Sequence, residues 1–232
     1  MLKFAVLSLF GLLILLLLGG ASSHLLTERQ QAYFEGQIVY FITYTSSQPG
    51  INIESLKDAL GSEMRLTFKK GSYKKEYRAP DDRLLSTRYL DLRREKSYLF
   101  KAGLDTIFWF DITSPDTKLT FTVLPDTTVL NKRCTVLETV TYHQPSNTEA
   151  PVRLKGRYYY SQDLAVNPDW YSSYREANFN VLMKAAGGLI AKSYRQGLYW
   201  EEHLAIKSIT RRKVKRSEIR PPVKKGAPLR KL

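Results

Sequence analysis

The sequence predicts a mainly β protein: one large, curved antiparallel sheet, a half-barrel, wrapped over one or two α-helices. Short stretches of alternating apolar and polar residues follow one another at hairpin spacing along most of the chain. Helical periodicity is confined to two short segments. A sheet of about ten strands curls into a barrel or half-barrel rather than staying flat. A doubly wound parallel fold is not expected, because long helices do not alternate with the strands.

The first strand candidate is 34–45, where apolar residues repeat at period two on one face. The opposite face carries Val39 and Phe41, so we expect both faces to be covered. The segment 52–60 has amphipathic helical spacing and ends at Gly61. The strand candidates that follow alternate in the same way and are separated by turn residues: 64–69, 73–78, 84–92, 97–102, 106–112, 119–124, 134–142 and 152–161.

The periodicity changes in the last third of the chain. Residues 172–186 carry an apolar stripe at helical spacing, and two glycines directly after them stop the helix. Two strands, at 189–195 and 198–209, close the domain. A further basic strand is predicted at 212–220, before a pair of prolines.

The beginning of the chain has the features of a secretory signal peptide. Lys3 precedes a nearly pure apolar run at 4–18, and the small residues at 19–22 provide a cleavage site. We therefore expect the protein to be exported, to the periplasm or beyond. The alternative is an inner-membrane anchor at residues 4–20, because the apolar run is close to the minimum length that spans a bilayer.

These features divide the chain into three parts. We expect a signal peptide at residues 1–21 and a single antiparallel β half-barrel domain at 22–222. Residues 223–232 are expected to form a basic, disordered tail.

The formal net charge of +14 is concentrated near the C-terminus. From Lys207 onward there are eleven basic residues and a single acid, Glu218. Such a segment is typical of contact with anionic lipid or another polyanion, and nucleic acid is not expected as the partner of an exported protein. The other interpretation is a charged edge strand that stays soluble. The residues expected to contact a polyanion or head group are Arg211, Arg212, Lys213, Lys215 and Arg216.

No known catalytic or metal-binding motif is present, so we expect neither an enzyme nor a cofactor or metal. The single cysteine, Cys134, lies on the apolar face of its strand and is expected to be a buried, inert thiol. A functional thiol or an intermolecular disulfide are the alternatives. Glu201 and Glu202 are adjacent in a strand and so face opposite ways. The histidines lack metal-ligand spacing, and they are His24, His143 and His203.

Several short motifs together resemble a known family. They are 34–40, Tyr89, Tyr98, 130–134, 158–161, Trp170, 187–190 and 219–222. Between about Phe34 and Pro222 the chain resembles exported envelope proteins related to the GLPGLI family, and it is more distantly similar to the LolA-like lipoprotein-carrier superfamily. This resemblance implies a curved sheet over helices, with an apolar concave cavity that takes lipid acyl chains.

Two functions are consistent with these features. The first is binding of a lipid-like ligand, such as a lipid or lipoprotein acyl chain, in a cavity under the sheet. Alternation suggests that Phe108, Phe110, Phe121, Val136 and Leu182 line this cavity. The second is a filled, non-enzymatic interaction module that docks a protein partner or an anionic membrane surface through the basic residues of the last strand. Abundant aromatic residues fit either, because they also pack across strands.

Overall fold

The computed structural model describes residues 32–46, 48–114, 119–143, 152–223 and 226–232. The predicted signal peptide and the alternative membrane anchor lie outside these residues. The compact unit is Tyr33–Leu232. In the described part of the chain, no helix combines the length and the apolar character needed to cross a membrane.

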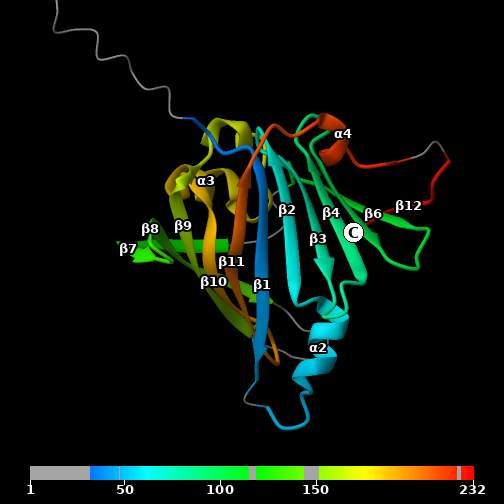
Figure 1. Ribbon diagram of the computed structural model, residues 1–232, viewed down its shortest axis with the longest axis horizontal. Helices are drawn as coiled ribbons and strands as arrows, with labels where there is room; N and C mark the ends of the chain where they lie inside the picture. Colours follow the sequence, from blue (N-terminus) through cyan, green and yellow to red (C-terminus); the bar gives the residue numbers. More distant parts are fainter. Residues whose placement is uncertain (1–31, 47, 115–118, 144–151, 224–225) are drawn as a thin grey trace, which may run out of the picture. The chain divides into compact units, whose positions relative to one another are not determined.

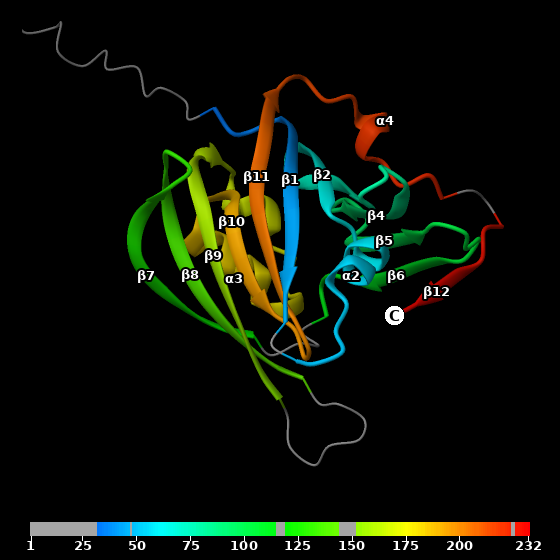
Figure 2. The same cartoon turned by 60° about the horizontal axis from the view of Figure 1, so that its bottom comes forward.

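The described residues form one sheet of 12 strands in the order β12-β6-β5-β4-β3-β2-β1-β11-β10-β9-β8-β7 (Figures 1 and 2). The bounds are β1 Gly36–Thr45, β2 Glu63–Lys69, β3 Ser72–Arg78, β4 Leu84–Asp91, β5 Lys96–Lys101, β6 Ile107–Asp111, β7 Leu119–Val129, β8 Lys132–His143, β9 Val152–Ala165, β10 Gly188–Gln196, β11 Glu201–Arg211 and β12 Leu229–Lys231. Every neighbouring pair is antiparallel except β12 and β6. The predicted fold class, a large curved antiparallel sheet with few helices, is confirmed.

Among the described residues, three short α-helices accompany the sheet: α2 Ile53–Leu60, α3 Phe179–Ala186 and α4 Arg216–Ile219. The predicted helix at 52–60 is confirmed as α2, and the side chain of Asn52 caps it by accepting hydrogen bonds from two backbone N–H groups. Figure 2 shows β7 to β11 curving around α3. The apolar side of α3 is buried against the core.

The core lies on the concave face of the sheet. On β1 the side chains of Ile38, Tyr40, Ile42 and Tyr44 alternate into it and are almost completely buried. The opposite face is not covered as predicted, since Phe41 is 51% exposed. The sheet therefore buries one face and leaves the other to solvent, as antiparallel sheets commonly do.

The helix predicted at 172–186 is shorter in the structure and occupies only Phe179–Ala186. Ala177 and Asn178 have φ angles of 52° and 54°, in the left-handed region. They belong to the 3₁₀ turn Glu176–Asn178, which separates α3 from the irregular segment that contains the earlier 3₁₀ turn Pro168–Tyr171. Apolar spacing alone could not reveal this break.

The prediction of a basic strand at 212–220 is wrong. β11 ends at Arg211, and the chain then runs to the single helical turn α4. Val214 and Ile219 are buried, and Arg212 forms an ion pair with Glu218 across the turn. The tail also differs from the disordered segment we expected, because β12 pairs in parallel with β6.

Candidate functional site

A cavity of about 200 Å³ opens on the concave side of the sheet, and we refer to it as the sheet cavity. Strands β1 to β3 and β9 to β11 form its walls, and α3 and the turn Pro168–Tyr171 contribute to its cover. Its apolar and aromatic lining includes Tyr40, Met64, Leu66, Phe68, Tyr171, Phe179, Met183, Ile190 and Leu204. Its volume exceeds that of cavities of about 150 Å³ that bind benzene, and is below the roughly 300–1,000 Å³ of sites for drug-sized ligands.

The short length of α3 is one reason why space remains under the sheet. α3 has eight residues, and the left-handed residues Ala177 and Asn178 prevent it from extending toward its N-terminus. Small residues on β10 add room, because Gly188 and Ser193 both line the sheet cavity. A Cβ atom on Gly188 would lie 2.2 Å from the backbone oxygen of Ser161, so only glycine allows β9 to approach this closely.

Tyrosines of β9 lie on both faces of the sheet, as the alternation predicts. The rings of Tyr158 and Tyr160 are stacked with centroids 6.2 Å apart, and both line the sheet cavity. Tyr159 lies on the opposite face and contacts Tyr194 edge to face. The hydroxyl of Tyr40 stabilises the fold, because it donates a hydrogen bond to the backbone oxygen of Ile190 at 2.9 Å.

Three charged side chains line the otherwise apolar sheet cavity: Lys75, Arg195 and Glu202. Arg195 and Glu202 form an ion pair, with Nη2 and Oε2 separated by 2.7 Å. Lys75 has no ion pair or hydrogen bond with any residue that the structure describes. Its Nζ lies 4.7 Å from the centroid of the Tyr73 ring. The sheet cavity therefore contains a lysine without a partner carboxylate.

Burial lowers the pKa of Lys75 to about 8, and the positive charges of Arg88 and Arg195 lower it further in the same direction. Burial also raises the pKa of the neighbouring Tyr73 to about 12, so its hydroxyl stays protonated at neutral pH. An apolar surrounding makes an unpaired ammonium group costly and favours an anionic partner for it. The sheet cavity can thus accommodate an apolar chain and provide a positive charge for an acidic end.

None of the five residues predicted to line a cavity lines this one. Val136 is buried in β8, and Leu182 is buried in α3 within the core cluster. Phe110 and Phe121 are half-buried and pack against the same cluster, while Phe108 lies near Lys101 on the neighbouring strand β5. Alternation places residues on a face of the sheet, but it does not show which strands the helices leave uncovered.

Lys75 is not among the predicted site residues, although the sequence carries a signal for it. Lys75 lies between Tyr73 and Tyr77 at period two on β3, so all three share one face of the strand. A lysine on an aromatic face is unusual, because lysine is rarely buried without a partner. The turn pattern around the segment 73–78 predicts only that it forms half of a hairpin.

The basic residues expected to form one contact surface are used in different ways. Arg211 donates a hydrogen bond to the backbone oxygen of Asp163, and its guanidinium lies 5.3 Å from the centroid of the Phe34 ring. Arg212 forms an ion pair with Glu218. The remaining three, Lys213, Lys215 and Arg216, are exposed and have no carboxylate partner among the described residues.

Cys134 is completely buried, as expected, and burial raises the pKa of its thiol. It is a free cysteine whose thiol donates to the backbone oxygen of Lys132. Glu201 and Glu202 do face opposite ways, because Glu202 lines the sheet cavity while Glu201 lies 3.6 Å from Nε2 of His203. His24 and the side chain of His143 lie outside the described residues. Within those residues, acidic, histidine and cysteine side chains do not gather into a group that could hold a metal ion.

No family model matches the chain, so the resemblance to the GLPGLI family remains a prediction. No curated protein matches it either. Among solved structures, LprF from Mycobacterium bovis matches with a TM-score of 0.33 and 9% identity over 82% of this chain and 90% of that chain. The lipoprotein LppX from Mycobacterium tuberculosis matches with a TM-score of 0.32 and 7% identity over 78% and 89% of the two chains. Neither likeness bears on the function of this chain.

Proposed function

We propose that this protein binds an apolar, lipid-like ligand with an acidic end in the sheet cavity. The observation that carries the proposal is the unpaired Lys75 in a cavity lined mainly by aromatic and aliphatic side chains. The chain of the ligand occupies the apolar part, and its acidic group pairs with the ammonium group of Lys75. No catalytic group is needed for this role.

The energetics support binding of an acyl chain. Each buried methylene contributes about 0.8 kcal/mol, so about five of them contribute about 4 kcal/mol, which matches the lower end of the roughly 4–15 kcal/mol that association costs. The charge pair with Lys75 adds about 1.5–3 kcal/mol, because it forms in an apolar surrounding. Met64 and Met183 line the sheet cavity, and their flexible side chains let it adapt to chains of different shape.

The predicted signal peptide fits this role, since a carrier of apolar ligands works in the envelope or outside the cell. Lipids and lipoprotein acyl chains are the ligands we propose for an exported protein of this kind.

Native mass spectrometry of the protein, purified from cells without detergent, tests the proposal. We expect a population heavier than the bare chain, and organic extraction should release an acidic lipid or fatty acid. A Lys75→Met variant purified in the same way should carry much less of it. A bare mass, together with no uptake of added fatty acid by the purified protein, would contradict the proposal.

A second candidate function is docking on an anionic membrane surface. It is favoured by Lys213, Lys215 and Arg216, which are exposed and lack a carboxylate partner in the described structure. Vesicle binding that falls steeply with added salt would support it.

A further inference from the structure

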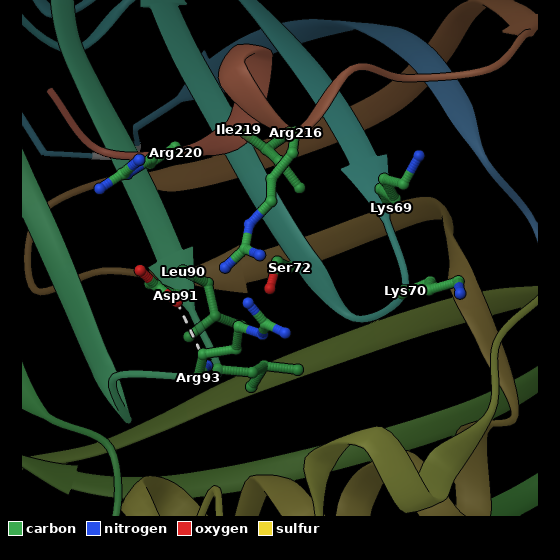
Figure 3. A pocket seen from close by; sticks show the side chains of 10 residues that line it. Lys69, Lys70, Ser72, Leu90, Asp91, Arg93, Arg216, Ile219 and Arg220 are labelled. Carbon is green, nitrogen blue, oxygen red and sulfur yellow. Dashed lines mark hydrogen bonds between the residues drawn. The ribbon is translucent and has the colours of Figure 1, made fainter.

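A second cavity, of about 260 Å³, lies where the β2–β3 turn, the β4–β5 turn and α4 meet (Figure 3). We refer to it as the basic pocket. Leu90, Leu92 and Ile219 provide its apolar lining. Its charged lining residues are five cations and one acid, namely Lys69, Lys70, Arg93, Arg216, Arg220 and Asp91.

The walls of the basic pocket are fixed by buried contacts. Ile219 anchors α4 in the core, and Val214 anchors the segment before it. The carboxylate of Glu35 accepts hydrogen bonds from the backbone N–H of Val214 at 2.6 Å and from Nζ of Lys69 at 2.9 Å. These contacts tie α4 to β2, so Arg216 is held above the strands.

The β2–β3 turn is equally constrained. Gly71 has a φ of 81°, in the left-handed region, and a Cβ atom there would lie 2.6 Å from Cδ1 of Leu92 and 2.9 Å from Cβ of Trp170. Only glycine fits, and the close approach places the β2–β3 turn against the β4–β5 turn. Ser72 and Arg93 therefore line the same pocket.

Most of the positive charge in the basic pocket is not neutralised by the protein. Arg93, Arg216 and Arg220 form no ion pair with any residue that the structure describes. The acid, Asp91, is already engaged, because it accepts a hydrogen bond from the backbone N–H of Arg93 at 3.2 Å and lies 3.7 Å from Nε of Arg94. Figure 3 shows the guanidinium groups of Arg93 and Arg216 extending toward Ser72.

We infer that the basic pocket binds a phosphate group, with Arg93 and Arg216 holding its oxygens and the hydroxyl of Ser72 donating a further hydrogen bond. A guanidinium offers parallel N–H donors whose spacing matches the oxygens of a phosphate, and two of them that converge neutralise its charge. The group belongs either to a lipid head group or to a small soluble phosphate. This inference is independent of ligand binding in the sheet cavity.

Two binding experiments test it and distinguish the two sources. Calorimetric titration with inorganic phosphate at low salt reports on a soluble ligand. Co-sedimentation with phosphatidylcholine vesicles, with and without phosphatidic acid, reports on a head group. We expect saturable binding in at least one arm. Arg93→Ala and Arg216→Ala should each weaken it about tenfold or more, since a charge-assisted hydrogen bond is lost.

Two further variants separate a shaped site from general attraction to positive charge. Arg153→Ala removes an exposed arginine of β9 outside the pocket, and binding should not change. Arg93→Lys keeps the charge but loses the planar donors, so binding should still weaken several-fold. The three positions, Arg93, Arg153 and Arg216, are exposed, and thermal melting of the four variants excludes misfolding as the cause of any loss. Absence of binding in both arms, or equal losses in Arg153→Ala and Arg93→Ala, would overturn the inference.

Discussion

The sheet cavity and the basic pocket are both built on the curved sheet, but they work in different dielectric surroundings. The sheet cavity is apolar and has one unpaired cation, Lys75. The basic pocket is open to solvent at the turns and has three unpaired arginines among its lining residues. An ionic interaction is several times stronger in a low-dielectric interior than in water. One half-buried lysine in an apolar cavity can therefore orient a ligand, whereas a more open pocket needs several guanidinium groups to hold an anion.

The largest effect on this comparison should come from filling the sheet cavity. Ile190→Trp adds an indole ring to the lining of the sheet cavity, so we expect fatty-acid binding to weaken by about tenfold or more while phosphate binding stays unchanged. Fluorescence titration with a fatty-acid probe measures the first, and calorimetry the second. Val181→Trp is the matched control, because Val181 is 50% exposed on the outer side of α3. Equal fatty-acid binding by both variants would place the ligand elsewhere.

Removing the unpaired charge of Lys75 from the sheet cavity should separate acidic from neutral ligands. In Lys75→Met we expect a fatty acid to bind about tenfold more weakly, because a charge-assisted pair is lost. The alcohol of the same chain length should bind as before or slightly better. We also expect a higher melting temperature, since an unpaired, half-buried ammonium group is removed from an apolar surrounding. Lys74→Met is the control on the same strand, because Lys74 faces the other way and pairs with Glu76 at 2.9 Å. If the fatty acid and the alcohol lose affinity equally, Lys75 does not bind the acidic group of the ligand.

The pH dependence of binding should differ between the two sites. The pKa of Lys75 is lowered to about 8, so in the free protein its charge is complete below pH 8 and is lost above it. Fatty-acid affinity should therefore be highest below pH 8 and fall as pH rises. Stability of the free protein should rise between about pH 8 and the unfolded pKa of about 10.4, where only the unfolded state holds the proton. Arginines do not titrate in this range, so phosphate binding lacks this decline. A flat profile for the fatty acid would contradict this.

The smallest expected effect concerns the support of α4. Arg212 and the backbone N–H of Lys215 lower the pKa of Glu218 to about 2. The interactions of the Glu218 carboxylate therefore contribute to the free energy of unfolding above the unfolded pKa of about 4.3. This contribution is lost as pH falls toward 2. Because the ion pair is partly exposed, Glu218→Gln should weaken phosphate binding only about two- to five-fold and leave fatty-acid binding unchanged. Calorimetry at neutral pH checks this, and a loss as large as that in Arg216→Ala would mean that Glu218 does more than support the helix.

The pattern of the sequence predicts the sheet well and the two sites poorly, for physical reasons. Alternation along β1 and β9 specified which side chains enter the core, because side-chain direction follows directly from the strand backbone. The extent of α3 depends on two left-handed residues, Ala177 and Asn178, that apolar spacing does not reveal. Since the sheet cavity exists partly because α3 is short, its lining could not be read from alternation.

The C-terminal segment shows the same limit. Its charge was evident from the sequence, but the chain turns away from the sheet after Arg211 and returns as α4. Arg216 therefore meets Arg93, which is far away in the sequence and belongs to a turn between two other strands. The placement of Arg216 and Arg93 in one pocket depends on the tertiary fold. The burial of Ile219 and the hydrogen bonds of Glu35 produce it.

The most direct test of the proposed function is the titration of Lys75 itself, followed by nuclear magnetic resonance of lysine side chains with and without a fatty acid. Lys75→Met identifies its signal. In the free protein we expect a pKa of about 8. With the fatty acid bound, the carboxylate should stabilise the ammonium and shift that pKa upward, toward or above the ordinary lysine value of about 10.4. A pKa that stays unchanged while the fatty acid binds would show that the ligand does not reach Lys75 and would contradict the account.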